Sequence, residues 1–406
     1  MQSASSDFVH LARPYLLVSF LPYYEDEAGA VWLDPSWHHD LIEHLSYLKD
    51  FTLCAPRLRK GAEPNLVRFE PPAGSRMRIV PLPPQTSLSR AVRALPKTVG
   101  ALWRAVGSAE VVHSSVIGWP FPLGWITNPV AVLRRKRLLV IVEAPWLRSG
   151  PDGTSWKLKL LDVASEAMAR WSCNHADVAI FSHTAYRDTL FTHGRGAAYV
   201  TPAVWVNQAD ILDPASAQIS WTRKLTEPIR LLFAGRLVAA KGIEVLLSAL
   251  RMLDARGVGA SVDVVGVGER RDACLQTRAS LGSVRLDVLD PVPYGAPFLR
   301  LVDRYHALLI PSLSDEQPRV LFDANARAVP AIASNTDGLR PHIEHGKTGW
   351  LVPTGDPQSL AAAIEHASVS APELSTMGMA ALDAARAFTH RAMHRSRSAI
   401  LQKHFA

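Results

Sequence analysis

Short apolar segments typical of strands alternate with longer helical patterns along the chain, and this alternation constrains the fold more than any other feature. In the first half the segments are PYLLVSF, FTLCAP, RMRIVPL, AEVVHSS, RLLVIVE, ADVAIFS and AAYVTPA, and in the second half they are IRLLFAG, SVDVVGVG, VRLDVLD, HALLIPS, PAIAS and GWLVP. Strands that are apolar throughout are buried on both faces, as in parallel sheets covered by helices. The sequence therefore predicts an α/β protein with parallel sheets.

The length of the chain indicates two domains, because 406 residues exceed what one hydrophobic core usually serves. We expect an N-terminal domain over residues 1–212 and a C-terminal domain over residues 213–385. A basic helical tail, residues 386–406, is expected to pack back on the N-terminal domain. Residues 207–230 are polar and contain two prolines, so they are interpreted as an interdomain linker.

Composition excludes several classes of protein. Hydrophobic residues make up 48% of the chain and charged residues 20%, which indicates a globular protein. Cys54, Cys173 and Cys274 are far apart and form no C-x-x-C pair, so neither a disulfide framework nor a zinc ribbon is expected. Residues 111–133 carry no Asp, Glu, Lys or Arg, but three prolines and several polar residues argue against a membrane span. A reducing cytoplasm is the expected location.

The net charge of +7 is concentrated in two basic segments. These are RRKR at residues 134–137 and a partly amphipathic helical pattern over residues 90–106, which includes Leu102 and Trp103. Such a helix suits an anionic membrane surface, although a basic solvated face that keeps the protein soluble has the same composition. We favour peripheral membrane attachment. Nucleic acid is not expected as a partner, because no helix-turn-helix, zinc-finger or RNP-like pattern accompanies the charge.

Ligands of open parallel sheets bind at the carboxyl ends of strands, so each junction between a strand and the next helix is a candidate site. In IRLLFAGRLVAAKG, Gly235 and Arg236 follow a strand and Lys241 precedes a helix. Two cations beside a helix N-terminus predict an anion site, most simply for a diphosphate. The alternative is that Lys241 is solvated and Arg236 pairs with a carboxylate.

The next two junctions offer glycines and carboxylates. Gly266 and Gly268 directly follow a strand and indicate either a tight turn or close approach to a nucleotide base. Further on, Ser314 and Gln317 have the spacing of a capping box, which predicts a helix start. Capping explains neither Asp315 nor Asp323, which we therefore interpret as candidate functional carboxylates. A fourth junction is punctuated by Gly338, Gly346 and Gly349.

These junctions, in this order, resemble the C-terminal half of the retaining glycosyltransferases of family 4, also called group 1, which have the GT-B fold of two Rossmann-like doubly wound domains facing a cleft. GRLVAAKG is similar to the family's G-R-L-x-x-x-K-G, GWLVPTGDP to its G-x-L-V-x-x-x-D, and FDANARAVPAIAS to its E-A-M-A-x-G-x-P-V-I-A. The family's paired glutamates fall on Asp315 and Asp323. The resemblance implies that Asp323 holds the ribose hydroxyls of a nucleotide and that Asp315, or the adjacent Glu316, lies near the donor sugar.

The resemblance also implies an activity. A sugar would pass, with retention, from a UDP or GDP sugar to a lipid-linked or polysaccharide acceptor, by a front-face displacement in which Arg236 and Lys241 stabilise the leaving diphosphate. No metal or further cofactor is implied, since the nucleotide sugar is a co-substrate. Two alternatives stay open: a sugar-nucleotide epimerase or a phosphorylase with the same architecture, and a non-catalytic partner of a glycan assembly complex at a membrane surface.

Several other polar residues are candidates in the first half. His113 and Glu143 each follow a predicted strand, where a general acid or base would face the cleft, although a lone His or Glu there is more often structural. The acidic run at residues 25–27 is interpreted as a surface loop rather than a metal site. His38, His39 and His44 lack a metal-ligand spacing and are interpreted as solvated helix residues.

Overall fold

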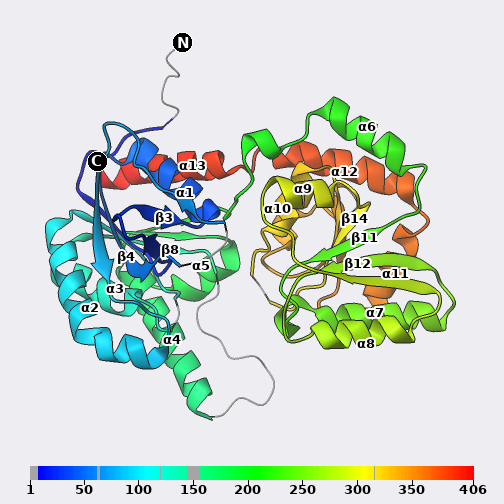
Figure 1. Cartoon of the computed structure of the whole chain (residues 1–406), viewed down its shortest axis with the longest axis horizontal. Coiled ribbons are helices and arrows are strands. Elements are labelled where there is room, and N and C mark those ends of the chain that lie inside the picture. Colours follow the sequence, from blue (N-terminus) through cyan, green and yellow to red (C-terminus); the bar gives the residue numbers. More distant parts are fainter. Residues whose placement is uncertain (1–7, 62–64, 119, 145–155, 315) are drawn as a thin grey trace. The chain divides into compact units, whose positions relative to one another are not determined.

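The computed structural model describes residues 8–61, 65–118, 120–144, 156–314 and 316–406 (Figure 1). The chain divides into two compact units. The first unit comprises residues 1–202 together with 391–406, and the second comprises residues 203–390. The sequence-based boundaries were 212 and 385, whereas the divisions in the structure follow residues 202 and 390. The first division differs because the second unit includes the segment that was expected to link the domains.

The first unit contains a sheet of ten strands, in the order β10-β9-β8-β7-β1-β4-β2-β3-β5, with β6 also paired to β4. The pairs from β10 to β4, and β6 with β4, are parallel, whereas β3 pairs antiparallel with both β2 and β5. The strands are β1 (Tyr15–Val18), β2 (Tyr23–Glu25), β3 (Val31–Leu33), β4 (Asp50–Arg59), β5 (Val67–Arg68), β6 (Arg76–Leu82), β7 (Val111–Ser115), β8 (Arg137–Val142), β9 (Val178–Phe181) and β10 (Ala197–Val200).

Helices cover both faces of this sheet. Its helices are α1 (Pro35–Tyr47), α2 (Leu88–Ser108), α3 (Gly124–Leu133), α4 (Trp156–His175), α5 (Thr184–Leu190) and α13 (His390–Phe405). One core contains residues of α1 and α13, such as Leu41 and Leu401, and the other contains residues of α2 to α5, such as Leu102 and Ala169. The C-terminal helix is therefore an integral layer of the first unit.

The second unit contains a six-stranded, fully parallel sheet in the order β13-β12-β11-β14-β15-β16. This is the arrangement that fully apolar strands predict, and β11, β12 and β14 are largely or wholly buried. The strands are β11 (Leu231–Ala234), β12 (Ala260–Val265), β13 (Val284–Leu289), β14 (Ala307–Ile310), β15 (Ala331–Ser334) and β16 (Gly349–Val352).

The helices of the second unit also form two layers. They are α6 (Pro214–Lys224), α7 (Ile243–Ala255), α8 (Arg271–Ser280), α9 (Ala296–Val302), α10 (Val320–Ala326), α11 (Pro357–Ala367) and α12 (Ala371–Ala385), with short 3-10 turns η1 (Gln208–Asp210), η2 (Ala239–Lys241) and η3 (Arg340–His342). Residues of α6, α7, α8, α11 and α12 join one core, and residues of α9 and α10 join the other. Both α6 and α11 begin with an Asp-Pro pair, in which the Asp carboxylate accepts backbone N–H bonds and the Pro needs no N–H partner.

The segment at residues 207–230 is not an irregular linker. It contains helix α6, whose Trp221 is fully buried and donates its indole N–H to the carbonyl of Ala328 at 2.8 Å. Its polar composition misled the sequence interpretation, because the polar residues form the solvent side of a helix whose Ala217 and Trp221 lie in the core. Residues 207–230 therefore belong to the second unit.

Residues 111–133, the longest run without charged side chains, form strand β7 and helix α3 rather than one continuous helix. Among the described residues, no helix combines the length and the apolarity that crossing a bilayer would require. The three cysteines are free and buried.

Candidate functional site

The loop after β11 lies at the carboxyl edge of the second sheet, where the candidate site begins. Gly235 follows the strand directly, and its N–H donates to the carbonyl of Val265 at 3.0 Å. Arg236 comes next and is exposed, and within the described part of the chain its guanidinium makes no hydrogen bond or ion pair. An exposed guanidinium at a strand end is available to an anionic ligand.

Helix α7 begins beside this loop, at Gly242. This residue has a φ of +72°, and a Cβ built on it would lie 1.7 Å from the carbonyl oxygen of Pro311. Only glycine fits here, because a side chain would collide with the backbone that leaves β14. No side chain caps the N-terminus of α7. The partial positive charge of this 13-residue helix therefore faces the same edge, and Glu244, the carboxylate in its first turn, forms an ion pair with Arg270.

Lys241, the second predicted cation, is not free. Its ammonium lies 2.7 Å from a carboxylate oxygen of Glu316, and both side chains are mostly buried, with 17% and 24% of their surface exposed. The pair joins the loop after β11 to the loop after β14. The structure thus brings Lys241 and Glu316 together, and Lys241 can contribute to an anion site only as a member of this ion pair.

Gly266 and Gly268, after β12, have a structural explanation. Cβ atoms built on them would lie 1.9 Å from the carbonyl oxygen of Gly235 and 2.3 Å from that of Leu237. The two loops are also linked by the N–H of Leu237, which donates to the carbonyl of Val267 at 2.8 Å. The glycines let one loop pack against the other, so they shape the floor of the site through close backbone approach.

Asp323 is the most unusual carboxylate of this edge. It lies in the first turn of α10, is only 3% exposed, and accepts a hydrogen bond of 3.0 Å from the hydroxyl of Tyr294. Burial raises the pKa of Asp323 from its ordinary 3.8 to about 7, although the Tyr294 hydrogen bond and the charge of Arg319 act in the opposite direction. A buried carboxyl with a pKa near neutrality is typical of a functional site.

Tyr294 was not identified as a site residue from the sequence. It lies in the loop between β13 and α9, a strand-to-helix junction that contains neither a cation nor a glycine pair before the aromatic residue. The tyrosine is 49% exposed, its ring stacks on Phe298 with centroids 6.3 Å apart, and its hydroxyl reaches Asp323. The sequence alone could not identify Tyr294, because only the strand order shows that its loop lies beside Asp323.

The helix start predicted at Ser314 is wrong. Helix α10 begins at Val320, and Arg319 at its N-cap makes no side-chain capping bond. Gln317 instead accepts the N–H of Ala203 at 2.9 Å and contacts His342 Nε2 at the same distance. The amide of Gln317 therefore ties together three loops of the second unit. Asp315, the predicted partner of Asp323, lies outside the described residues.

His113 and Glu143, the candidates of the first unit, are both committed to internal contacts. His113 is the third residue of β7 rather than a strand-end residue; it is 7% exposed and lies 2.9 Å from the hydroxyl of Tyr15. Burial lowers the pKa of His113 well below its ordinary value, so the imidazole is neutral. Glu143 directly follows β8, but its carboxylate forms an ion pair with Arg397 of α13. The structure therefore offers no unengaged acid or base at these two positions.

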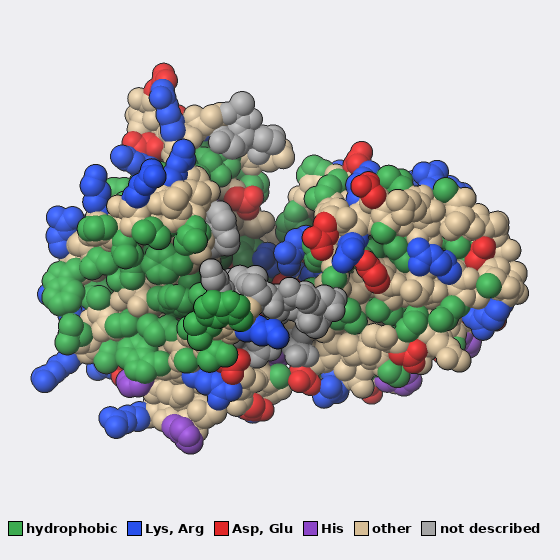
Figure 2. Space-filling model, turned by 90° about the horizontal axis from the view of Figure 1, so that it is seen from below, with side chains coloured by type: hydrophobic (Ala, Val, Ile, Leu, Met, Phe, Trp, Pro, Cys, Tyr) green, Lys and Arg blue, Asp and Glu red, His purple; other side chains and the backbone are tan. Residues whose placement is uncertain are grey.

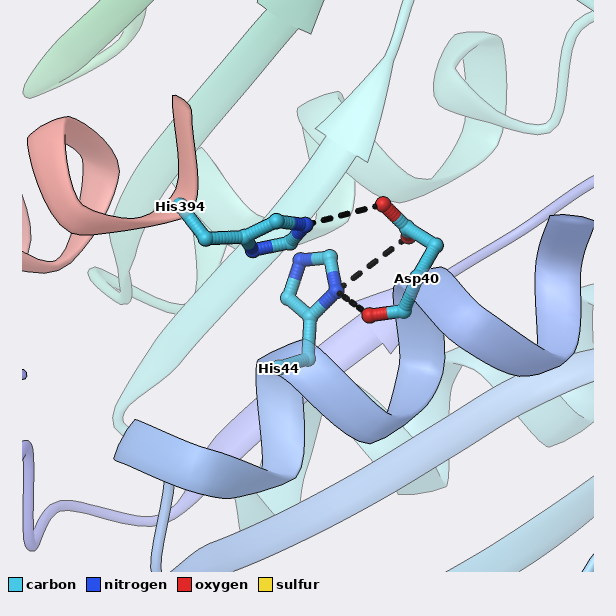
Figure 3. A group of neighbouring side chains, drawn as sticks. All are labelled: Asp40, His44 and His394. Atoms are coloured by element: carbon cyan, nitrogen blue, oxygen red, sulfur yellow. Dashed lines mark hydrogen bonds and ion pairs between the residues drawn. The ribbon is translucent and has the colours of Figure 1, made fainter. Parts of the chain in front are cut away.

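A buried polar cluster lies between α1 and α13 (Figure 3). His394 Nε2 is 3.0 Å from one carboxylate oxygen of Asp40, and His44 Nδ1 is 3.2 Å from the other. The second nitrogen of His394 lies 3.0 Å from the hydroxyl of Tyr47. The prediction that His44 is solvated is therefore wrong, because a partner 350 residues away in the sequence covers it.

The three ligand-type side chains of this cluster, Asp40, His44 and His394, have atoms within 4.8 Å of one another. Their hydrogen bonds account for this spacing, since each carboxylate oxygen of Asp40 faces one imidazole and His44 Nδ1 also contacts the carbonyl of Asp40 at 2.9 Å. We interpret the cluster as the polar part of the contact that holds α13 in the first unit. The acidic run at residues 25–27 likewise lies at the end of β2 and in the turn that follows it, where Asp26 accepts the indole N–H of Trp32 at 2.8 Å.

The family of the chain follows from its motifs and from comparison with known proteins. The family model of "Glycosyl transferases group 1" matches residues 228–368, which include the loops with Arg236, Lys241, Gly266 and Asp323. This chain belongs to the group 1 glycosyltransferase family. Among curated proteins it is 29% identical, over 178 residues, to the amylovoran biosynthesis glycosyltransferase AmsK of Erwinia amylovora, covering 42% of this chain and 43% of that protein.

A longer alignment exists with the D-inositol 3-phosphate glycosyltransferase of Nocardia farcinica. It is 31% identical over 302 residues, which is 70% of this chain and 64% of that protein. These alignments therefore span less than two thirds of the curated relatives they match. They place the chain in the family without fixing which sugar or acceptor it takes.

Solved structures match both units. The sucrose-phosphate synthase of Thermosynechococcus elongatus has a TM-score of 0.70 at 18% identity, covering 96% of this chain and 98% of that one. The Anabaena protein HepE, in complex with UDP-glucose, has a TM-score of 0.64 at 15% identity, covering 96% and 99%. At such identities the likeness shows the fold, which is the predicted GT-B arrangement of two parallel-sheet α/β domains.

Proposed function

We propose that this protein is a retaining glycosyltransferase that moves a hexose from a nucleotide-sugar donor to a glycan or lipid-linked saccharide acceptor. The observation that carries the proposal is the juxtaposition at the carboxyl edge of the second sheet. An uncapped helix N-terminus and an exposed Arg236 follow β11, and the buried carboxyl of Asp323 follows β14, the strand paired with β11.

Each part of this edge suits one part of a nucleotide sugar. The free N–H groups of α7 and the guanidinium of Arg236 would bind the diphosphate. The carboxylate of Asp323 would accept hydrogen bonds from the two ribose hydroxyls, and the exposed ring of Tyr294 lies beside it as an apolar surface. HepE, the Anabaena structural neighbour, is the protein with a bound UDP-glucose, so we propose a uridine diphosphate sugar as the first donor to test.

The chemistry would need no protein nucleophile. The hydroxyl oxygen of the acceptor forms a bond to C1 of the sugar, the bond from C1 to the diphosphate oxygen breaks, and the leaving diphosphate takes the proton of the acceptor. Negative charge grows on the diphosphate during this step. The α7 N-terminus, which the backbone holds in place before the reaction, and the exposed guanidinium of Arg236 would stabilise that charge. Lys241 would contribute less than a free lysine, because Glu316 neutralises it at 2.7 Å.

Thermal unfolding with nucleotides tests the proposal. The wild type and the variants Arg236→Ala and Asp323→Asn would be melted with UDP, GDP, ADP and their glucose and mannose conjugates. A ligand at 100 times its Kd stabilises the folded protein by about 2.7 kcal/mol. We expect one nucleotide to raise the Tm of the wild type and to have little effect on either variant. Arg285→Ala is the matched control, because Arg285 is an exposed arginine of the same unit on the strand β13.

A second assay separates an enzyme from its alternatives. The selected nucleotide sugar is incubated with the protein, with and without oligosaccharide and lipid-linked acceptors, and nucleoside diphosphate release is measured. Release that depends on an acceptor supports the transferase, and conversion of the donor sugar without any acceptor would indicate an epimerase. Absence of any nucleotide-dependent shift in Tm would contradict the proposed donor site and favour a non-catalytic partner.

A further inference from the structure

Helix α2 exposes apolar side chains that its packing does not require. Its core-facing side contains five buried residues, Ala91, Thr98, Leu102, Ala105 and Val106. A second row, Leu88, Val92, Leu95, Val99 and Trp103, recurs at helical spacing and is 37% to 59% exposed. We call this row the apolar stripe. A helix that only covers a sheet exposes polar residues on the side facing solvent, so the apolar stripe needs another explanation.

The apolar stripe continues onto the two neighbouring helices. Helix α3 packs on α2 and ends with Leu133, which is 71% exposed, and α4 packs on α3. Trp156, Leu160 and Val163 of α4, spaced along one side of that helix, are 61% to 71% exposed. Figure 2 shows hydrophobic side chains gathered on this face of the first unit, with many Lys and Arg side chains and a few Asp, Glu and His side chains around its border. An exposed apolar surface spread over several elements marks an interaction site.

The charges of α2 and of the residues that follow it indicate what kind of partner this surface binds. Residues 88–137 contain eight Lys and Arg residues and a single acidic residue, Glu110, which pairs with Arg13. Among the described residues, none of the eight basic side chains forms a salt bridge with a carboxylate. Four of them, Arg90, Arg93, Lys97 and Arg104, are exposed along α2 on the side away from the apolar stripe. Such a surface is complementary to an array of negative charges above an apolar layer.

A pocket at the end of this basic row could receive phosphate groups. It has a volume of about 840 Å³ and is lined by Lys97 and Arg104 of α2, by Arg57 of β4 and by a run of prolines. The guanidinium of Arg134 lies over the ring of Trp103, in the apolar stripe, at 4.8 Å, so an aromatic ring and a cation are side by side at this surface. Tryptophan and arginine are residues that occupy the interface between lipid headgroups and acyl chains.

We propose that the face formed by α2, α3 and α4 docks the first unit on an anionic phospholipid bilayer, with α2 lying in the plane of the headgroups. The apolar stripe enters the acyl boundary and the basic row of α2 remains at the phosphates. A bilayer fits this face better than a protein partner does, because the exposed apolar residues are spread over three helices and because α2, unlike α4, carries cations without any carboxylate. The inference does not depend on donor binding, and its test contains no nucleotide.

Sedimentation with vesicles tests the docking. The full chain is mixed with vesicles of phosphatidylcholine alone and with vesicles that also contain phosphatidylglycerol, at low salt and at about 1 M salt, where the Debye length is about 3 Å. We expect binding to the anionic vesicles at low salt, and a large loss of binding at high salt. Equal binding to both lipids, or no binding to either, would overturn the proposal.

Three paired variants make the test specific. Val92→Gln with Val99→Gln removes two exposed members of the apolar stripe, and we expect vesicle affinity to fall about tenfold or more. Arg93→Gln with Lys97→Gln removes two cations, and at about 1 kcal/mol each the loss should be about thirtyfold. Ile219→Gln with Val369→Gln is the control, since these residues are 71% and 81% exposed in the second unit.

The remaining outcomes are also decisive. All variants should melt as the wild type does, because the changed side chains lie on the surface. If the control variant lost binding as the stripe variant does, the docking face would be wrongly placed. If the wild type formed dimers in analytical ultracentrifugation that the stripe variant did not form, and bound no vesicles, the face would be an interface between two copies of the chain and the bilayer proposal would be wrong.

Discussion

The pKa of Asp323 makes donor affinity depend on pH in a way that can be calculated. Only the ionised carboxylate accepts hydrogen bonds from both ribose hydroxyls, and burial raises its pKa to about 7. The ionised fraction is therefore about one tenth at pH 6 and about nine tenths at pH 8. The affinity of the wild type for UDP-glucose should accordingly be about tenfold lower at pH 6 than at pH 8.

The same pKa shift affects the stability of the unliganded protein, which falls as the pH rises, whereas donor affinity increases. The pKa is higher in the folded state than in the unfolded chain, so the contribution of Asp323 to stability is fully present below about pH 3.8 and is lost as the pH rises through about 7. Moving the pKa from 3.8 to about 7 corresponds to about 4 kcal/mol. Asp323→Asn should therefore be more stable than the wild type at pH 8 while it binds UDP-glucose more weakly.

Isothermal titration with UDP-glucose between pH 6 and pH 8, together with urea unfolding at the same pH values, measures both effects. The sugar diphosphate has no ionisation of its own in this range, so a change in affinity belongs to the protein. A wild-type Kd that is equal at pH 6 and pH 8 would refute the reasoning. So would an Asp323→Asn variant that binds as tightly as the wild type at pH 8, because the carboxylate would then not contact the ligand.

Three further changes test other parts of the structure. Tyr294→Phe removes a hydrogen bond that lowers the pKa of Asp323, so the pH at which UDP-glucose affinity is half-maximal should rise in the same titration. Lys224 is fully buried, its ammonium has no hydrogen-bond partner among the described residues, and burial lowers its pKa from 10.5 to about 8. Because this penalty is present below about pH 8 and is relieved as the pH rises toward 10.5, Lys224→Met should gain about 3 kcal/mol in urea unfolding at pH 7 and about 1 kcal/mol at pH 10, whereas the exposed control Lys347→Met should change little. A gain that does not shrink with pH would mean that Lys224 is not the titrating group. Gly242→Ala should lower the free energy of unfolding by at least about 2 kcal/mol, since φ is +72° and the new Cβ would meet a backbone oxygen at 1.7 Å, while Gly257→Ala, at a φ of +69° in open space, should cost about 1 kcal/mol. Equal losses in the two variants would show that the loop around Gly242 relaxes.

Local patterns predicted most strands of the two sheets, because burial on both faces leaves an apolar run that is visible without any partner, but the short strands β2, β3 and β5 were not predicted. RLLVIVE and HALLIPS, for example, contain β8 and β14. The same reasoning located Arg236 and Asp323 at strand-to-helix junctions of one sheet edge. These are properties of a short segment and of the rule that parallel strands end at a common edge.

Pairings between distant segments could not be predicted in this way. His44 was expected in solvent because its spacing from His38 and His39 matches no metal site, and the residue that buries it, His394, belongs to another helix far along the chain. Lys241 was expected to be free or solvated, and its partner Glu316 arrives on a different loop. Gly266 and Gly268 were assigned either to a turn or to a nucleotide, and the backbone of a neighbouring loop supplies the real constraint. In each case the deciding contact depends on which elements the fold brings together.

The return of α13 to the first unit has a consequence for biosynthesis. The second unit is complete at residue 390, whereas the first unit lacks a helical layer until residues 391–406 have been made. Buried contacts such as the one between Arg397 and Glu143 cannot form before then. The first unit, although it begins the chain, therefore cannot be completed until the whole second unit has been synthesised. Removal of this helix should consequently damage the unit at the opposite end of the sequence.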